Sequence, residues 1–279
     1  YISGSLIKVF SGIIIEPQLA LQKATDENIA NIGPTVLPRI DLPFELLVDE
    51  LTLIDPSWDF YGAQHRQDSI VLAGSWLNRG LKMTRLDVSS RDLGELTLHG
   101  ELAFEADWPV RADVNIDLAQ PSMRPQLFGQ RLTLDVQGSL GSLAIQLTSA
   151  GDIKTVVDAE INVLGPDLPF SATLTATSSG ALRLADLDAV PDFFPDVELK
   201  FPVVASASGT ASSQNFTLQV VAGGKDYDAL ALSLKGEHEA GKILIRQLSI
   251  LDGTADNALH ASGEAVSYTH LTLPTIYSV

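Results

Sequence analysis

Ser5 and Lys8 form a Ser-x-x-Lys motif, which supplies a nucleophile and its base in penicillin-recognising enzymes. The companion motifs Ser-Asp-Asn and Lys-Thr-Gly do not occur, and both residues lie in a strand-like run. The sequence also contains no Gly-x-Ser-x-Gly elbow, no Walker loop and no Gly-x-Gly-x-x-Gly fingerprint. We therefore expect a protein that is not an enzyme.

Histidine and carboxylate side chains could instead hold a metal ion. The five histidines are scattered and form no His-Glu-x-x-His pattern: His65, His99, His238, His260 and His270. An acidic cluster could bind Ca²⁺, but it lacks the glycine of an EF-hand and is interrupted by Pro191 and Pro195; its members are Asp186, Asp188, Asp192, Asp196 and Glu198. With no cysteine in the chain, thiolate sites and disulfides are excluded. We predict no metal and no cofactor, and a solvated acidic loop.

The segment from Gly94 to Leu118 shows which elements dominate the chain. Apolar residues occupy its even positions, and Glu, Thr, His, Asp, Arg and Asn most of its odd ones. A period of two directs alternate side chains to opposite faces of a strand. We expect one face of this ribbon to line a groove through Leu96, Leu98, Leu102, Phe104, Trp108, Val110, Val114, Ile116 and Leu118.

The same alternation recurs between clusters of Gly, Ser, Asp or Pro, at Leu132–Val136, Leu143–Leu147, Val157–Val163, Phe170–Ala176, Phe216–Ala222 and Leu230–Leu234. Helical periodicity is nearly absent, with weak candidates at Leu19–Ile32 and Leu182–Val190. The pattern predicts an all-β fold: a long antiparallel β-meander, curled into an open groove, with almost no helix.

The number of strands sharpens this expectation. At about 12 residues per strand and turn, the chain would form on the order of 20 strands and extend roughly 100 Å along the stacking direction. Because open twisted sheets rarely exceed ~10 strands without curling or splitting, the sheet should fold over on itself. The alternative is an ordinary β-sandwich, whose strands alternate in the same way.

Charge and hydropathy restrict the partners. Lys and Arg number 18 against 35 Asp and Glu, so the net charge is −17, which opposes nucleic acid. No stretch approaches the roughly 18 consecutive apolar residues of a membrane helix. Any membrane anchor should therefore lie outside this sequence.

Several segments carry a family resemblance. Gly94–Gly100, Phe104 and Asp107–Val110 resemble the Gly-Glu-Leu-x-Leu-x-Gly … Asp-[Tyr/Trp]-Pro-[Leu/Val] units of TamB proteins. Ile40–Phe44 with Leu51–Leu53, and the glycine spacing of Gly253–Gly263, are similar to further TamB segments. The resemblance covers Leu6 to Ala265 and consists of strand rhythm more than unique chemistry, a rhythm that AsmA-like proteins of the bridge-like lipid transfer superfamily share.

The resemblance implies a periplasmic protein of a Gram-negative bacterium, anchored in the inner membrane. It also implies a groove for phospholipid acyl chains, and as partner an outer-membrane Omp85-type barrel (TamA-like). Two other functions remain open: a scaffold that templates the strands of outer-membrane barrel and autotransporter proteins, and an adhesin or filament repeat.

The two ends of the sequence do not resemble natural termini. Tyr1 stands where an initiator Met would, and Val266–Thr275 can be written in codons that resemble a transposase sequencing adapter read in frame. We expect residues 1–265 to be a fragment of a longer groove and residues 266–279 to be adapter read-through.

Overall fold

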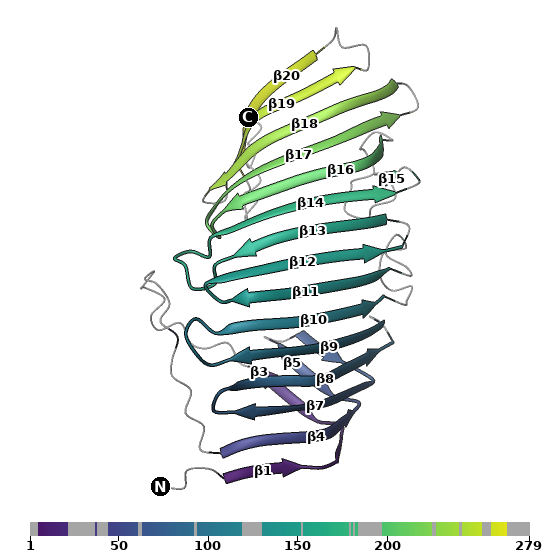
Figure 1. Ribbon diagram of the computed structural model, residues 1–279. Helices are drawn as coiled ribbons and strands as arrows, with labels where there is room; N and C mark the ends of the chain where they lie inside the picture. The colour runs from purple at the N-terminus through teal and green to yellow at the C-terminus, as the bar shows by residue number, and fades with distance from the viewer. Residues whose placement is uncertain are drawn as a thin grey trace, which may run out of the picture.

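The protein is almost entirely β-structure in the computed structural model (Figure 1). The structure describes residues 5–21, 37, 44–60, 63–91, 94–118, 130–151, 153–178, 180, 182–183, 197–224, 227–239, 242–252 and 258–266. These residues include no helix, and hence none that could span a membrane. The predicted all-β class is confirmed. Most of the helix candidates at Leu19–Ile32 and Leu182–Val190, and residues 267–279, lie outside the described residues.

The described residues form twenty strands. In order they are β1 (Ser5–Val9), β2 (Gly12–Ile15), β3 (Gln18–Leu21), β4 (Phe44–Ile54), β5 (Ser57–Phe60), β6 (Ala63–Arg66), β7 (Ser69–Leu77), β8 (Gly80–Ser90), β9 (Gly94–Ala103), β10 (Pro109–Asp117), β11 (Arg131–Ser139), β12 (Ser142–Ala150), β13 (Ile153–Ile161), β14 (Phe170–Ser178), β15 (Leu182–Arg183), β16 (Val197–Gly209), β17 (Ser213–Gly224), β18 (Tyr227–Glu239), β19 (Lys242–Asp252) and β20 (Ala258–Val266).

Seventeen of these strands form one open sheet. From β7 to β14 and from β16 to β20, each strand pairs antiparallel with the next. β1 and β2 lie end to end beside β4 and parallel to it, and β14 and β15 share the edge of β16. The seventeen segments therefore fill fifteen strand positions. At ~4.8 Å per position the sheet is roughly 70 Å long, shorter than the 100 Å expected from twenty stacked strands.

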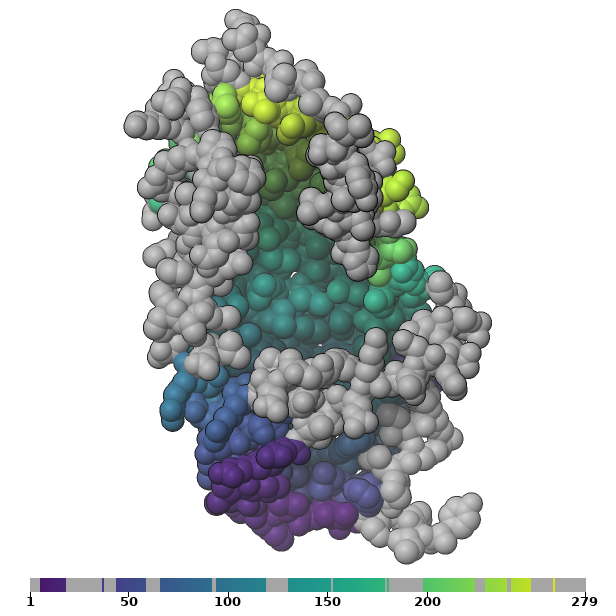
Figure 2. Space-filling view, turned by 180° about the vertical axis from the view of Figure 1, so that it is seen from behind, coloured from purple at the N-terminus to yellow at the C-terminus, as the bar shows by residue number. Residues whose placement is uncertain are grey.

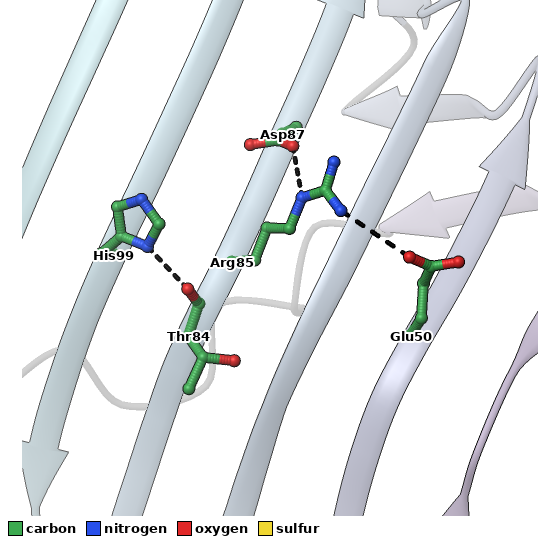
Figure 3. Close-up of polar contacts among 5 residues, drawn as sticks. All are labelled: Glu50, Thr84, Arg85, Asp87 and His99. Carbon is green, nitrogen blue, oxygen red and sulfur yellow. Dashed lines mark hydrogen bonds and ion pairs between the residues drawn. The ribbon is translucent and has the colours of Figure 1, made fainter.

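A second, three-stranded sheet consists of β3, β5 and β6. β3 and β5 lie behind β7–β9 in Figure 1. In Figure 3 other strands pass behind the sheet, on the side away from Arg85 and Asp87. The small sheet thus lies on one face only, near the N-terminal end. The β-sandwich alternative is wrong for the main sheet, which is single and open.

The alternating runs found in the sequence fall in strands, from β11 to β14 and in β17 and β18, except that Val157–Val163 extends two residues past the end of β13. The long run from Gly94 to Leu118 is divided into β9 and β10 by a turn that contains Phe104 and Trp108. Four strands that those runs did not include, β4, β8, β16 and β19, carry register irregularities. In β4, β8 and β19 the irregularity interrupts strict alternation, and this interruption hid them from a search for period two. In β16 the odd positions from Val197 to Ala207 remain apolar across it.

Three of these irregularities are β-bulges that insert a polar pair between two alternating halves of a strand. The pairs are Asp49–Glu50 in β4, Thr84–Arg85 in β8 and Arg246–Gln247 in β19. In each case the apolar positions switch from odd to even or from even to odd across the bulge. Because the two residues of each pair oppose a single residue of the neighbouring strand, the apolar side chains before and after the bulge remain on the same face.

The bulges of β4 and β8 are linked across β7 on the polar face (Figure 3). The Arg85 guanidinium lies 2.6 Å from Asp87 and 3.7 Å from Glu50. Nδ1 of His99 lies 2.6 Å from the backbone oxygen of Thr84. These exposed ion pairs contribute little stability on their own, about 0–1 kcal/mol each. Their arrangement shows that this face, with its charged side chains, is the solvated one.

Bulges bend the strands that contain them. Here the extra residue lengthens the polar face, so bending leaves the apolar face on the inner side of the curve. Figure 2 shows the face that carries the small sheet, and it is hollowed over the teal strands in the middle of the molecule. The predicted open, curled sheet is therefore present.

Deletion of Thr84 tests the role of the bulge. Removing one residue of the pair restores plain alternation, so Leu86 and Val88 keep their face and the free energy of unfolding falls by no more than about 1 kcal/mol for the lost surface contacts. Deletion of Asp87 is the matched control, because it moves Val88 to the polar face and should cost about 3 kcal/mol or more. Urea unfolding measures both. Equal losses for the two deletions would contradict this account.

Candidate functional site

The predicted groove residues of β9 and β10 lie opposite one another. Leu96 pairs with Ile116, Leu98 with Val114, and Leu102 with Val110. Directly opposed residues in an antiparallel pair point to the same side of the sheet. The register therefore places these six side chains on one face, which we call the apolar face.

The apolar face continues across the whole sheet. One residue from each of thirteen successive strands forms the central apolar row: Leu51, Leu72, Leu86, Leu98, Val114, Leu134, Leu147, Val157, Leu174, Ala205, Leu218, Leu234 and Leu248. All thirteen are aliphatic. Nothing in the sequence shows that they align, because alignment depends on the register of every pair.

A second row runs beside the central one and contains smaller side chains. It consists of Val48, Gly74, Met83, Gly100, Ala112, Val136, Ile145, Ala159, Ala172, Ala207, Phe216, Gly236 and Ile245. Gly100, which ends the Gly94–Gly100 unit found in the sequence, falls in this row, and so does Gly236. A side chain at Gly236 would meet the ring of Phe216, since its Cβ would lie 2.4 Å from Cζ.

The side chains of the central row are only partly covered. Twelve of the thirteen are half-buried, and Val114 alone is buried, with 8% of its surface exposed. Neighbours in the same layer account for half-burial, whereas a packed second layer would bury the row completely. A hollow of about 150 Å³ opens on this face between β4, β7 and β8, lined in part by Leu72, Trp76 and Met83.

The other predicted groove residues, Phe104, Trp108 and Leu118, lie outside the paired parts of β9 and β10. Phe104 and Trp108 belong to the turn between β9 and β10, where their rings pack together with centroids 5.2 Å apart. Trp108 has a positive φ of 55°, so the chain reverses there rather than continuing as a strand. Leu118 follows β10 and donates its backbone N–H to the oxygen of Gln130 at 3.0 Å.

The turns at the same end of the strands as Phe104 and Trp108 are joined by hydrogen bonds, and we call this row of turns the lip. Phe104 N–H donates to Arg79 O, Leu140 N–H to Asp107 O, and Val163 N–H to Leu140 O. Farther along, the N–H of Ala211 donates to the oxygen of Asp167, and Ser212 donates both its N–H and its hydroxyl to the Asp167 carboxylate. The lip therefore runs as a connected border from β7 to β17.

A larger depression of about 680 Å³ lies over β11–β16 on the polar side, but its lining differs in kind. Its side chains are mostly acids, amides and hydroxyls, among them Asp135, Asp158, Glu160, Ser171 and Thr173. It is open to water. Unlike the apolar rows, this depression needs no further cover, because exposed polar groups are already solvated.

The motifs with possible chemistry serve other roles. Lys8 Nζ lies 3.3 Å from Asp49 and over the ring of Phe10, while His99 bonds a backbone oxygen. Among the described residues no three His, Asp or Glu side chains gather in a way that could hold a metal ion. Asp186, Asp188, Asp192, Asp196 and His270 lie outside those residues, as do most of Ile40–Phe44 and part of Gly253–Gly263.

Comparison with known proteins identifies one family. The family model described as the TamB N-terminal domain matches residues 14–266, most of the chain. Neither the curated proteins nor the solved structures include a match to this sequence.

The lip should loosen in acid at Asp167. Hydrogen bonds from Ser212, then Thr210, lower the pKa of this carboxyl below its usual 3.8. A group whose folded-state pKa is lowered stabilises at pH above its unfolded value, and that contribution is lost as pH falls through the folded value. Amide exchange at Ser212, corrected for intrinsic rates, should therefore accelerate below about pH 4. Asp167→Asn should show the faster exchange already at neutral pH, whereas Asp158→Asn on the polar face should not.

Proposed function

This chain belongs to the TamB family, and from this premise we propose that it is a non-enzymatic section of a bridge that carries phospholipids along its apolar face between the inner and outer membranes. Family membership relates it to the Gram-negative envelope and to the translocation and assembly module. In this proposal the sheet lies in the periplasm, is anchored in the inner membrane by a segment outside this chain, and has an Omp85-type, TamA-like barrel as its outer-membrane partner.

The observation that carries the proposal is a long apolar face that is incompletely covered. Fifteen positions at ~4.8 Å and strands of about nine residues give this face an area on the order of 2,000 Å². The largest apolar patch on an ordinary soluble monomer is about 300–600 Å². Acyl chains are a suitable cover, because each buried CH₂ contributes ~0.8 kcal/mol.

The direction of the apolar rows agrees with this occupant. The rows run along the stacking direction, perpendicular to the strands, so they form a continuous path rather than a closed pocket. The strands cross the path from one border to the other and end where the sheet meets water. A lipid could therefore keep its tails on the rows and its headgroup beside the strand ends.

A scaffold for barrel proteins is the second candidate, and the sheet edge supports it. Among the described residues, β1 and β2 form an edge strand with exposed apolar side chains, including Leu6, Ile13 and Ile15, which are 56%, 67% and 67% exposed. An exposed edge can pair with the strand of another chain. That function would use backbone groups of the edge, whereas lipid transport would use side chains of the apolar face.

Photo-crosslinkers separate the two candidates. Placed at Leu98 and Val114 on the apolar face, a crosslinker should capture phospholipid in cells, while one placed at Ile13 or Ile15 serves as the edge comparison. Capture of unfolded barrel protein at all four positions, with no phospholipid at Leu98 or Val114, would favour the scaffold and contradict the lipid proposal.

A charge on the central apolar row should block lipid loading. Leu98→Glu places a carboxylate between Val114 and Leu86, and desolvating it costs about 3 kcal/mol, so lipid retained per chain should fall by at least about tenfold. Native mass spectrometry of detergent-free protein measures the lipid.

The matched control is Asp113→Lys on the neighbouring strand. Asp113 lies on the polar face directly opposite Asp135, so the change replaces a like-charge pair and should contribute about 0.2–1 kcal/mol of stability while leaving lipid unchanged. Equal lipid loss in both variants would show that the apolar face has no special role.

A further inference from the structure

Two polar side chains, Gln214 and His238, interrupt the apolar face at the lip. They are opposed across β17 and β18, and they share the alternation of the apolar neighbours Phe216 and Gly236. His238 is the last but one residue of its strand and lies four residues, about 13 Å, from Leu234 of the central apolar row. Both side chains are half-buried.

The hydrogen bonds of Gln214 determine that Nδ1 of His238 is a donor. Nε2 of Gln214 lies 2.8 Å from the backbone oxygen of Thr210 and 2.6 Å from that of Ala211. Two carbonyl oxygens can only accept, so this amide atom must be the nitrogen donor. Oε1 is then the acceptor facing Nδ1 of His238 at 2.7 Å, and Nδ1 must carry the hydrogen.

The neutral ring therefore keeps its lone pair on Nε2. That atom has no hydrogen-bond partner among the described residues. Because this acceptor lies at the border between the apolar face and water, it could bind a donor group of a lipid headgroup whose tails lie on the apolar face.

We propose that His238 Nε2 accepts a hydrogen bond from the ammonium group of a phospholipid headgroup at the lip, an inference that rests on the proposed lipid transport. A cationic donor strengthens such a bond. The chain carries a net charge of −17, which favours a headgroup with an ammonium group over a headgroup with a net negative charge. The site would thus give the groove a preference for phosphatidylethanolamine over phosphatidylglycerol.

The structure offers a control of the same residue type. His99 also bonds through Nδ1, to the oxygen of Thr84, so its Nδ1 is likewise a donor, but it lies on the polar face (Figure 3). A change at His99 removes the same ring from the opposite side of the sheet.

The test uses the whole chain and vesicles of equal parts phosphatidylethanolamine and phosphatidylglycerol with the same acyl chains. After separation from the vesicles, native mass spectrometry counts total lipid per chain and the ratio of the two headgroups. Wild-type protein should be enriched in phosphatidylethanolamine. His238→Leu should reduce this enrichment roughly three- to tenfold, the factor of one hydrogen bond, with total lipid unchanged. His99→Leu should alter neither quantity, and His238→Gln, which retains an acceptor, should restore part of the preference.

The outcomes distinguish this inference from the function on which it rests. Wild-type protein that retains no lipid would contradict the proposed transport itself. Normal loading with an identical headgroup ratio in wild type and His238→Leu would overturn only the role of His238. A preference for phosphatidylglycerol that His238→Leu abolishes would also overturn it, since the ring would then be acting as a donor. His238→Gln keeps a polar side chain beside Gln214. It therefore tests the role of His238 in headgroup preference even if His238→Leu fails to fold.

Discussion

The structure depends on the register between neighbouring strands. Each pair is aligned so that aliphatic residues oppose aliphatic residues, and a slip of one residue in any pair would turn that strand's apolar side chains into water. Because a slip would expose apolar side chains at any strand, this free-energy cost specifies the register throughout the sheet. In an ordinary sandwich a second sheet would cover the apolar face. Here most of it is only half-covered, and the proposal of an occupant rests on that observation.

The bulges show how the sheet combines regular register with curvature. A sheet of fifteen positions that stayed flat would present a planar apolar surface. Polar pairs at Asp49–Glu50, Thr84–Arg85 and Arg246–Gln247 add length on the polar face alone, and their ion pairs keep that face in water. The curvature of the sheet and the polar character of that face therefore come from the same residues. The bulges of β4 and β8 lie side by side across β7, so the strands bend together.

The border of the apolar face has a different chemistry from its middle. Hydrogen bonds between successive turns hold the lip together, with Asp167 linking the turn after β13 to the turn after β16. The middle is uniformly aliphatic and cannot distinguish one headgroup from another. Any selectivity must reside where polar atoms meet the apolar rows, and the pair Gln214–His238 has that position. In our proposals, lipid retention depends on the apolar rows and headgroup recognition on the lip.

Sequence alone was sufficient for the all-β class, the strands with strict alternation and the common face of Leu96, Leu98, Val114 and Ile116, because alternation is local and each side chain's direction follows from its neighbours. It was not sufficient where the chain departs from period two. Bulges hid β4, β8 and β19, and the positive φ of Trp108 made a turn from residues that continued the alternation. Only the tertiary structure decided that seventeen strands fill fifteen positions, that Gly100 and Gly236 share a row, and that Gln214 meets His238. These features depend on which residues of distant strands are brought opposite one another, and that is set by the sum of all turns and registers between them.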